Sequence, residues 1–268
     1  MKIDRRKFLK AAGVSALASL GGKGAWEILD PGAVDAAEHG GHGHDKAKES
    51  GPKTRWAMLV DMRAMTEEKA DKIREVCDFA HNIPHWDDPE RELKWIWKEE
   101  YEHVFPSSYN EYISDDIKAM PFMLLCNHCD EPPCVRVCPV QATFRRPDGL
   151  VAQDYHRCIG CRFCMGACPY GSRSFNWFSA KVALEKEEGR KINKEFPVRT
   201  RGVVEKCNFC VERISLGKQP ACVEACPDVM HFGNLADSES EIRKILRKRM
   251  SLRRKLELGT HPMVFYLV

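Results

Sequence analysis

The segment "CIGCRFCMGACP", residues 158–169, decides how this chain must fold. Its cysteines, Cys158, Cys161, Cys164 and Cys168, follow the spacing C-x2-C-x2-C-x3-C, and Pro169 comes directly after the last one. The short intervals let three thiolates converge on three corners of one four-iron cluster, while the fourth cysteine and the proline lead the chain towards a second cluster. The segment therefore predicts iron–sulfur ligation.

Two further segments repeat this plan. "CNHCDEPPCVRVCP" has the spacing C-x2-C-x4-C-x3-C-P, and "CNFCVERISLGKQPACVEACP" has eleven residues between its second and third cysteines. Short expected strands, turns and cysteine loops alternate along the region, which is the mark of a structural repeat. We expect an α+β fold of tandem bacterial-ferredoxin-like cluster-binding domains, loop-rich and with peripheral helices. The cysteines of the two segments are Cys126, Cys129, Cys134 and Cys138, and Cys207, Cys210, Cys222 and Cys226.

Disulfides and structural zinc are the alternatives for these cysteines. Disulfide frameworks seldom repeat C-x2-C with a terminal Cys-Pro, and a zinc site needs two C-x2-C pairs, which leaves the trailing C-x3-C-P without a role. No C-x2-C pair is followed by histidine, so the motif for covalent haem attachment is absent.

The composition of the chain limits which classes of protein it can belong to. The chain has 268 residues, 43% hydrophobic content and a formal net charge of +3, and no apolar run is long enough to span a bilayer. This charge does not indicate nucleic-acid binding. No phosphate-binding glycine loop, nucleophile elbow or H-E-x-x-H helix accompanies the cysteines. We therefore expect a one-electron carrier with no substrate site of its own.

The N-terminus has the pattern of a targeting signal. "DRRKFLK", residues 4–10, precedes a weakly apolar run of small residues, the pattern of a twin-arginine export signal over residues 1–36. A polar linker is expected over 37–54, where His39, His42 and His44 offer a weaker metal-binding alternative. We expect a periplasmic or extracytoplasmic protein, peripheral to the membrane within a complex.

Outside the cysteine groups, periodicity predicts a few regular elements. Strands are expected over 55–63, 122–126, 149–154 and 263–268, and helices over 180–191 and 239–256. Thr66 is the expected N-cap of another helix, on which Ala70, Ile73 and Cys77 share one face, so Cys77 should point inward. The cluster-binding part is expected over 55–240, followed by a C-terminal helix and strand over 241–268.

The cysteine groups together with "NFCVERI" resemble the four-cluster ferredoxin-like subunits of membrane-linked oxidoreductases, such as dimethyl sulfoxide, nitrate and polysulfide reductases. Such a subunit connects a catalytic subunit to a quinone-handling membrane subunit. The family has four cysteine groups and this chain keeps three. Cys77 lies seven residues before Pro84 and follows Val60-Asp61, so it resembles the surviving last cysteine of a degenerate first group.

The resemblance implies that ligands cross between groups, each group lending its fourth cysteine to its partner. Three 4Fe–4S clusters then result and Cys226 is spare. In the competing scheme Cys226 closes the third cluster, and Cys77 is a small buried hydrophobic residue. The implied ligand sets are Cys126, Cys129, Cys134 and Cys168; Cys158, Cys161, Cys164 and Cys138; and Cys207, Cys210, Cys222 and Cys77.

A narrower resemblance is to the DsrO-type subunits of the Dsr (DsrMKJOP) membrane complex of sulfate reducers and sulfur oxidisers. It rests on residues 83–106, 127–139, 154–171 and 257–268. It implies a polytopic quinone-interacting membrane subunit, a multihaem cytochrome c and other Dsr subunits as partners in dissimilatory sulfur metabolism. The missing cluster argues against a molybdenum-type catalytic partner. The alternatives are the iron–sulfur subunit of another membrane oxidoreductase, such as a hydrogenase or a nitrite or tetrathionate reductase, and a docking protein with structural clusters.

Overall fold

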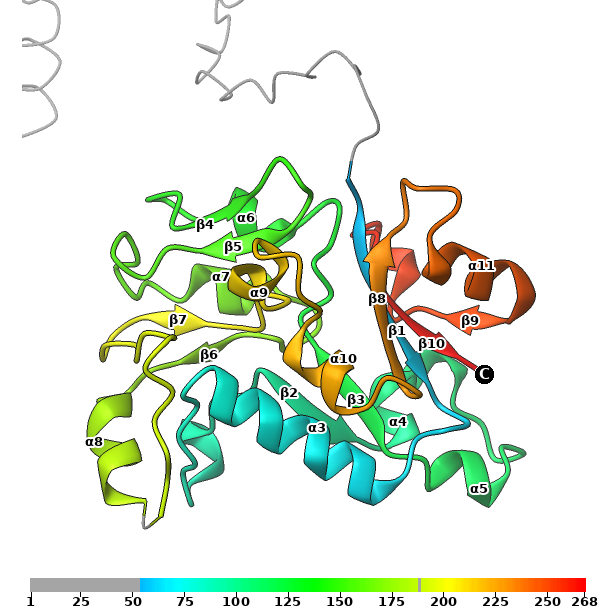
Figure 1. Cartoon of the computed structure of the whole chain (residues 1–268), viewed down its shortest axis with the longest axis horizontal. Helices are drawn as coiled ribbons and strands as arrows, with labels where there is room; N and C mark the ends of the chain where they lie inside the picture. Colours follow the sequence, from blue (N-terminus) through cyan, green and yellow to red (C-terminus); the bar gives the residue numbers. More distant parts are fainter. Residues whose placement is uncertain (1–53, 188) are drawn as a thin grey trace, which may run out of the picture. The chain divides into compact units, whose positions relative to one another are not determined.

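The computed structural model describes residues 54–187 and 189–268. The expected export signal and most of the expected linker lie outside these residues. Small sheets, short helices and long loops make up the described part, which confirms the predicted α+β, loop-rich class (Figure 1).

The largest sheet joins the first and last strands of the described chain. Its strand order is β8-β1-β10-β9, with β1 parallel to β10 and antiparallel to β8. Five of the six residues of β1 are buried, as expected for a strand with a neighbour on each side. The strands expected at 55–63 and 263–268 are thereby confirmed. Their bounds are β1 (Trp56–Asp61), β8 (Met230–Asn234), β9 (Ser251–Leu252) and β10 (Val264–Leu267).

Helix α3 (Glu67–Ala80) begins as the sequence predicts. The Thr66 hydroxyl accepts a hydrogen bond from the Lys69 backbone N–H at 3.3 Å, and Glu67 and Glu68 occupy the first turn. Ala70, Ile73 and Cys77 are buried, and the helix packs against α10 (Ala221–Ala225) and β2 (Ile96–Glu99). The prediction that Cys77 points inward is confirmed.

Three two-stranded antiparallel sheets support the cysteine loops, namely β2 with β3, β4 with β5 and β6 with β7. Their remaining strands are β3 (Phe122–Leu125), β4 (Thr143–Arg145), β5 (Val151–Gln153), β6 (Ser174–Phe175) and β7 (Val204–Glu205). The short helices are α4 (Tyr101–Val104), α5 (Asp115–Lys118), α6 (Pro133–Arg136), α7 (Phe163–Gly166), α8 (Ala180–Lys186), α9 (Val211–Ile214) and α11 (Glu241–Lys248). Single 3-10 turns are η1 (Pro89–Arg91), η2 (Pro106–Ser108) and η3 (Leu256–Leu258).

Two helices are shorter than the sequence predicts. The helix expected over 239–256 ends at Lys248, because Arg249 is extended and Ser251 and Leu252 pair with β10. Pairing with the edge of strand β10 is therefore more favourable for this basic segment than continuation of the helix that its periodicity predicts. The helix expected over 180–191 ends at Lys186.

The main core lies between α3, the large sheet and the β2–β3 pair. Trp95, Phe122 and Tyr266 are among its largest fully buried side chains, and Trp97 packs beside them. These tryptophans are packing residues of the core. Among the described helices, none is both long and apolar enough to cross a bilayer.

Candidate iron–sulfur cluster sites

All thirteen cysteines lie in the described part of the chain, and none of them forms a disulfide there. Nine are buried, three are half-buried and Cys161 alone is exposed. Unpaired thiols gathered in the interior fit metal ligation and give the disulfide alternative no support.

Cys126, Cys129, Cys134 and Cys168 line one small, almost entirely apolar cavity. The first three come from one cysteine group and Cys168 from the next, as the crossed scheme requires. Burial and the neighbouring thiols of this set raise the pKa of Cys129 to about 12. Three buried thiols and the half-buried Cys168 around a shared space suit a cluster that binds them as thiolates.

The side chain of Arg173 gives a second observation on whether a 4Fe–4S cluster fits this cavity. Its guanidinium is buried beside the cavity, and its Nη1 donates to Thr143 Oγ1 and Gln153 Oε1. Its Nη2 is buried without an acceptor among the described residues. A buried donor without a partner is costly, and a cluster sulfur is an acceptor of the right charge for it. The donor set and this unpartnered nitrogen both fit a 4Fe–4S group.

A second set draws on three distant segments. Cys77 comes from α3, Cys207 and Cys210 from the loop before α9, and Cys222 from α10. Burial and the neighbouring thiols of Cys207, Cys210 and Cys222 raise the pKa of Cys77 well above its usual value. The structure therefore places Cys77 with the three cysteines that the crossed scheme assigns to it.

The third set lies nearer the surface. The Thr143 N–H donates to Cys138 Sγ at 3.4 Å, and the Thr143 side chain also contacts the Cys164 thiol. Cys158 packs against the apolar cluster that contains Cys164. Cys161 stands exposed on the loop that joins Cys158 to α7.

Cys226 has a different environment. Its side chain is buried beside Cys222, and its Sγ lies 4.0 Å from the Lys69 carbonyl oxygen at the start of α3. A thiol can donate weakly to that oxygen, whereas a cluster-bound thiolate cannot. By contrast, Cys207 Sγ and Cys210 Sγ accept backbone N–H groups at 3.5 and 3.4 Å.

The first C-x2-C pair of each cysteine group shares one backbone feature. The residue before the second cysteine has a positive φ in these three pairs: 40° at His128, 72° at Gly160 and 56° at Phe209. This region favours glycine, and a histidine and a phenylalanine occupy it here. Gly160 is therefore the only one of the three residues whose type indicates the turn.

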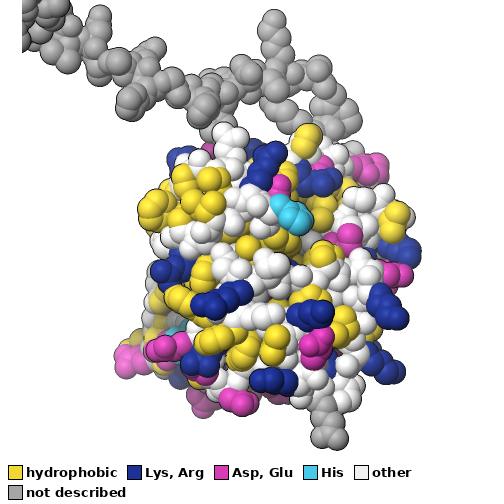
Figure 2. Space-filling model, turned by 90° about the vertical axis from the view of Figure 1, so that its left-hand side faces the viewer, with side chains coloured by type: hydrophobic (Ala, Val, Ile, Leu, Met, Phe, Trp, Pro, Cys, Tyr) yellow, Lys and Arg dark blue, Asp and Glu magenta, His cyan; other side chains and the backbone are white. Residues whose placement is uncertain are grey.

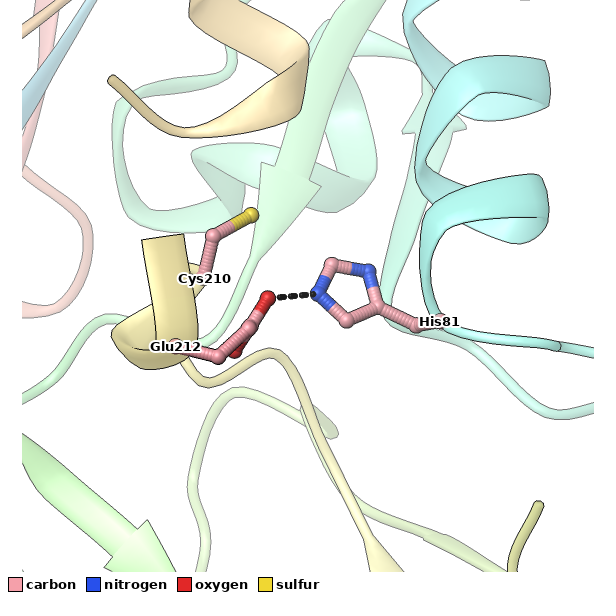
Figure 3. Close-up of side chains that lie close together, drawn as sticks. All are labelled: His81, Cys210 and Glu212. Atoms are coloured by element: carbon pink, nitrogen blue, oxygen red, sulfur yellow. Dashed lines mark hydrogen bonds and ion pairs between the residues drawn. The ribbon is translucent and has the colours of Figure 1, made fainter. Parts of the chain in front are cut away.

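Sequence reasoning also missed His81 and Glu212. One nitrogen of His81, the Cys210 sulfur and a carboxylate oxygen of Glu212 all lie within 4.8 Å of one another (Figure 3). The other ring nitrogen of His81 contacts Cys77 Sγ at 3.6 Å. Segments more than a hundred residues apart meet here, so no local pattern could have shown this contact.

Comparison with known proteins supports 4Fe–4S binding by this chain. The family model of the "4Fe-4S dicluster domain" matches residues 117–186 and 188–235. The chain is 38% identical to Hdr-like menaquinol oxidoreductase iron-sulfur subunit 1 of Archaeoglobus fulgidus, over 98% of this chain and 97% of that protein.

Two other relatives match over most of their length. The iron–sulfur cluster-binding subunit of menaquinone reductase from Nitratidesulfovibrio vulgaris is 34% identical, over 80% of this chain and 89% of that subunit. A subunit of the tetrathionate reductase of Salmonella typhimurium is 34% identical, over 82% of this chain and 74% of that subunit. The chain therefore belongs to the family of electron-transferring 4Fe–4S subunits of membrane oxidoreductases.

Proposed function

We propose that this protein relays single electrons through three 4Fe–4S clusters, one in each set of four cysteines. The observation that carries the proposal is that cysteines from different groups meet in the crossed pattern. Cys168 lines the cavity of the Cys126 set, and Cys77 lies with Cys207, Cys210 and Cys222. Cys226 is the spare cysteine in this arrangement.

Contacts between the sets support a linear relay. Burial and the neighbouring Cys126 thiol raise the pKa of Cys207, so these two thiols, from different sets, are close. At the other side of the Cys126 set, Cys134 packs in the same apolar cluster as Cys164. The order of the clusters along the relay is then the Cys77 set, the Cys126 set and the Cys158 set. These names stand for Cys77, Cys207, Cys210 and Cys222; for Cys126, Cys129, Cys134 and Cys168; and for Cys158, Cys161, Cys164 and Cys138.

The clusters supply one-electron chemistry, and the protein sets their reduction potentials by burial and by hydrogen bonds to sulfur. The Val204 N–H donates to Cys158 Sγ at 3.5 Å, and the Ala221 N–H to Cys210 Sγ at 3.4 Å. These donors disperse the negative charge of thiolate ligands. The Cys77 set is fully buried, while Cys161 opens the last set to solvent.

The surface around Cys161 suits a redox partner. Ile159, Phe163 and Trp177 are 64%, 63% and 41% exposed. Figure 2 shows hydrophobic side chains interspersed with Lys and Arg on the face that includes α8. Exposed apolar patches mark interaction sites, and we place the quinone-interacting membrane subunit here.

The relatives named for menaquinol oxidation and menaquinone reduction support a membrane quinone as one redox partner. The DsrO-type resemblance adds a multihaem cytochrome c, other Dsr subunits and a role in dissimilatory sulfur metabolism. The double arginine at residues 5–6 supports a twin-arginine export signal over residues 1–36, which directs the folded protein out of the cytoplasm. Residues 37–54 would then link this signal to the cluster-binding part. We place the protein outside the cytoplasm, peripheral to the membrane.

The proposal is tested with the complex purified anaerobically from membranes. A menaquinol analogue should reduce clusters of this subunit, and a c-type cytochrome co-purifying with it should exchange electrons with them. Iron and acid-labile sulfide should each be about twelve per chain. A zinc-loaded protein without iron, or clusters that no quinol or cytochrome can reduce or oxidise, would refute the relay. The second result would instead support clusters that only brace the loops.

A further inference from the structure

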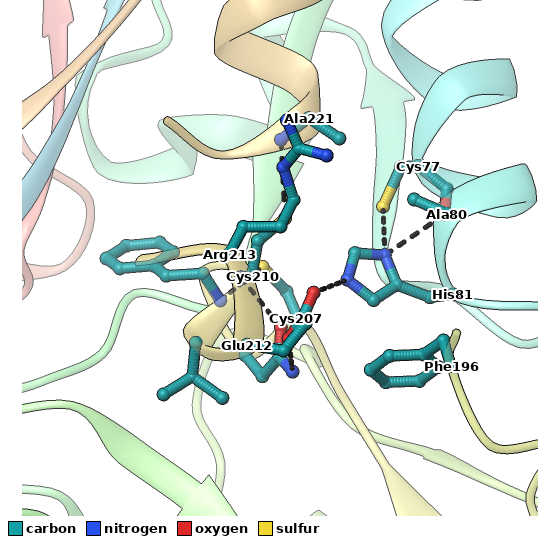
Figure 4. Close-up of polar contacts among 12 residues, drawn as sticks. Cys77, Ala80, His81, Phe196, Cys207, Cys210, Glu212, Arg213 and Ala221 are labelled. Carbon is teal, nitrogen blue, oxygen red and sulfur yellow. Dashed lines mark hydrogen bonds and ion pairs between the residues drawn. The ribbon is translucent and has the colours of Figure 1, made fainter. Parts of the chain in front are cut away.

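His81 stands at the edge of the most buried set of thiols. It is the C-cap residue of α3, four positions after Cys77, and its side chain is 1% exposed. Its Nδ1 lies 3.6 Å from Cys77 Sγ and 3.1 Å from the Cys77 carbonyl oxygen (Figure 4). One N–H on Nδ1 can be shared between these two acceptors in a three-centre hydrogen bond.

The ring is held in this orientation from two sides. It stacks on Trp95 with centroids 4.4 Å apart and an interplanar angle of 28°. Phe196 meets it edge-on at 4.8 Å. Both aromatic neighbours are buried, so the imidazole cannot turn away from Cys77 without disturbing the core.

Glu212 holds the opposite edge of the ring. Its Oε1 lies 3.1 Å from His81 Nε2, and its Oε2 accepts a hydrogen bond from Asn208 Nδ2 at 3.0 Å. The carboxylate fixes the ring from the side away from Cys77.

The partners of the ring assign its hydrogens. A cluster-bound Cys77 thiolate has no hydrogen to give, and the Cys77 carbonyl oxygen only accepts. Nδ1 must therefore carry the hydrogen that fills this contact, and Nε2 donates its own hydrogen to the Glu212 carboxylate, which can only accept. Hydrogen bonds to cluster sulfurs stabilise the more negative, reduced state and are one of the means by which a protein sets the reduction potential.

We propose that His81, held by Glu212, donates a hydrogen bond to the Cys77 sulfur and raises the reduction potential of the cluster that Cys77 closes. This inference rests on the proposed ligation by Cys77. His81 is thus a positioning residue that acts through the ligand. Because the donor is a side chain, substitution can remove it, which is not possible for the backbone N–H groups that serve other sulfurs.

The test is an anaerobic redox titration, followed by EPR, of the full cluster-loaded chain and its His81→Phe variant. Phenylalanine keeps an aromatic ring against Trp95 and removes both nitrogens. All three clusters should remain, and one midpoint potential should fall while the other two stay fixed. The matched control is His103→Phe, because His103 pairs with Glu99 at 3.3 Å and its side chain is 66% exposed. It should move no potential.

Three unchanged potentials in His81→Phe would overturn the inference. A parallel Cys77→Ser sample separates this failure from that of the relay scheme: if Cys77 is not a ligand, Cys77→Ser keeps three unperturbed clusters. If His81→Phe does not assemble, wild-type protein labelled with ¹⁵N-histidine replaces it. Pulsed EPR should then show a ¹⁵N coupling to the cluster that Cys77→Ser perturbs, and its absence would overturn the inference.

Discussion

The imidazole of His128 stacks on the phenyl ring of Phe209, with centroids 3.8 Å apart and planes 21° from parallel. The two residues hold equivalent positions in two C-x2-C turns, each just before the second cysteine. His128 also accepts the Val151 N–H at 3.2 Å, and its Nε2 lies 3.1 Å from the Cys207 carbonyl oxygen. Since Nδ1 accepts, Nε2 carries the hydrogen and donates to Cys207. This stack therefore fixes one cluster loop against the next.

Replacing His128 with alanine should weaken this junction. The change removes the stack and leaves the Val151 N–H without its acceptor, while the Cys207 carbonyl keeps only the Lys206 ammonium as a donor. We expect a cost of about 1–3 kcal/mol in the free energy of unfolding. Anaerobic denaturation followed by the visible absorbance of the clusters measures it. His128→Phe keeps the stack and should recover part of the loss. A His128→Ala protein as stable as the wild type would show that the junction does not depend on this residue.

Gly160 permits the turn in the exposed set. Its φ is +72°, and a Cβ added there would lie 2.3 Å from the Gly202 carbonyl oxygen, which is closer than atoms can approach. Gly160→Ala should therefore lose about four of about twelve irons and the EPR signal of one cluster. Gly166→Ala is the matched control, because its added Cβ would meet nothing within 4 Å. Full iron content in Gly160→Ala would contradict the assignment of this turn.

The exposure of the sets predicts the order in which the clusters are lost. Cys161 is exposed, and Cys138 and Cys158 are half-buried, whereas all four cysteines of the Cys77 set are buried. An iron chelator should therefore remove the Cys158-set cluster first and the Cys77-set cluster last. EPR at intervals during chelation gives the order. Early loss of the cluster that Cys77→Ser perturbs would contradict this prediction.

The cysteine spacing predicted the class of fold, because short intervals between thiolates constrain the chain locally. Strand β1 and the Thr66-capped start of α3 were equally predictable from alternation and capping. The contacts of His81 with Glu212 and of His128 with Phe209 join segments that the sequence separates by 131 and 81 positions. No local pattern specifies such contacts. The prediction of a helix over 239–256 was wrong beyond Lys248, because residues in the second half of that segment pair with strand β10. This pairing is a tertiary contact that helical periodicity does not reveal.

Anaerobic EPR of reduced wild type, Cys77→Ser and Cys226→Ser tests the central claim most directly. Cys77 lies with Cys207, Cys210 and Cys222, while the Cys226 thiol faces the Lys69 carbonyl. We predict that Cys77→Ser alters or removes the signal of one cluster and that Cys226→Ser leaves all three spectra unchanged. The reverse result, an altered cluster in Cys226→Ser beside three intact clusters in Cys77→Ser, would contradict the crossed scheme.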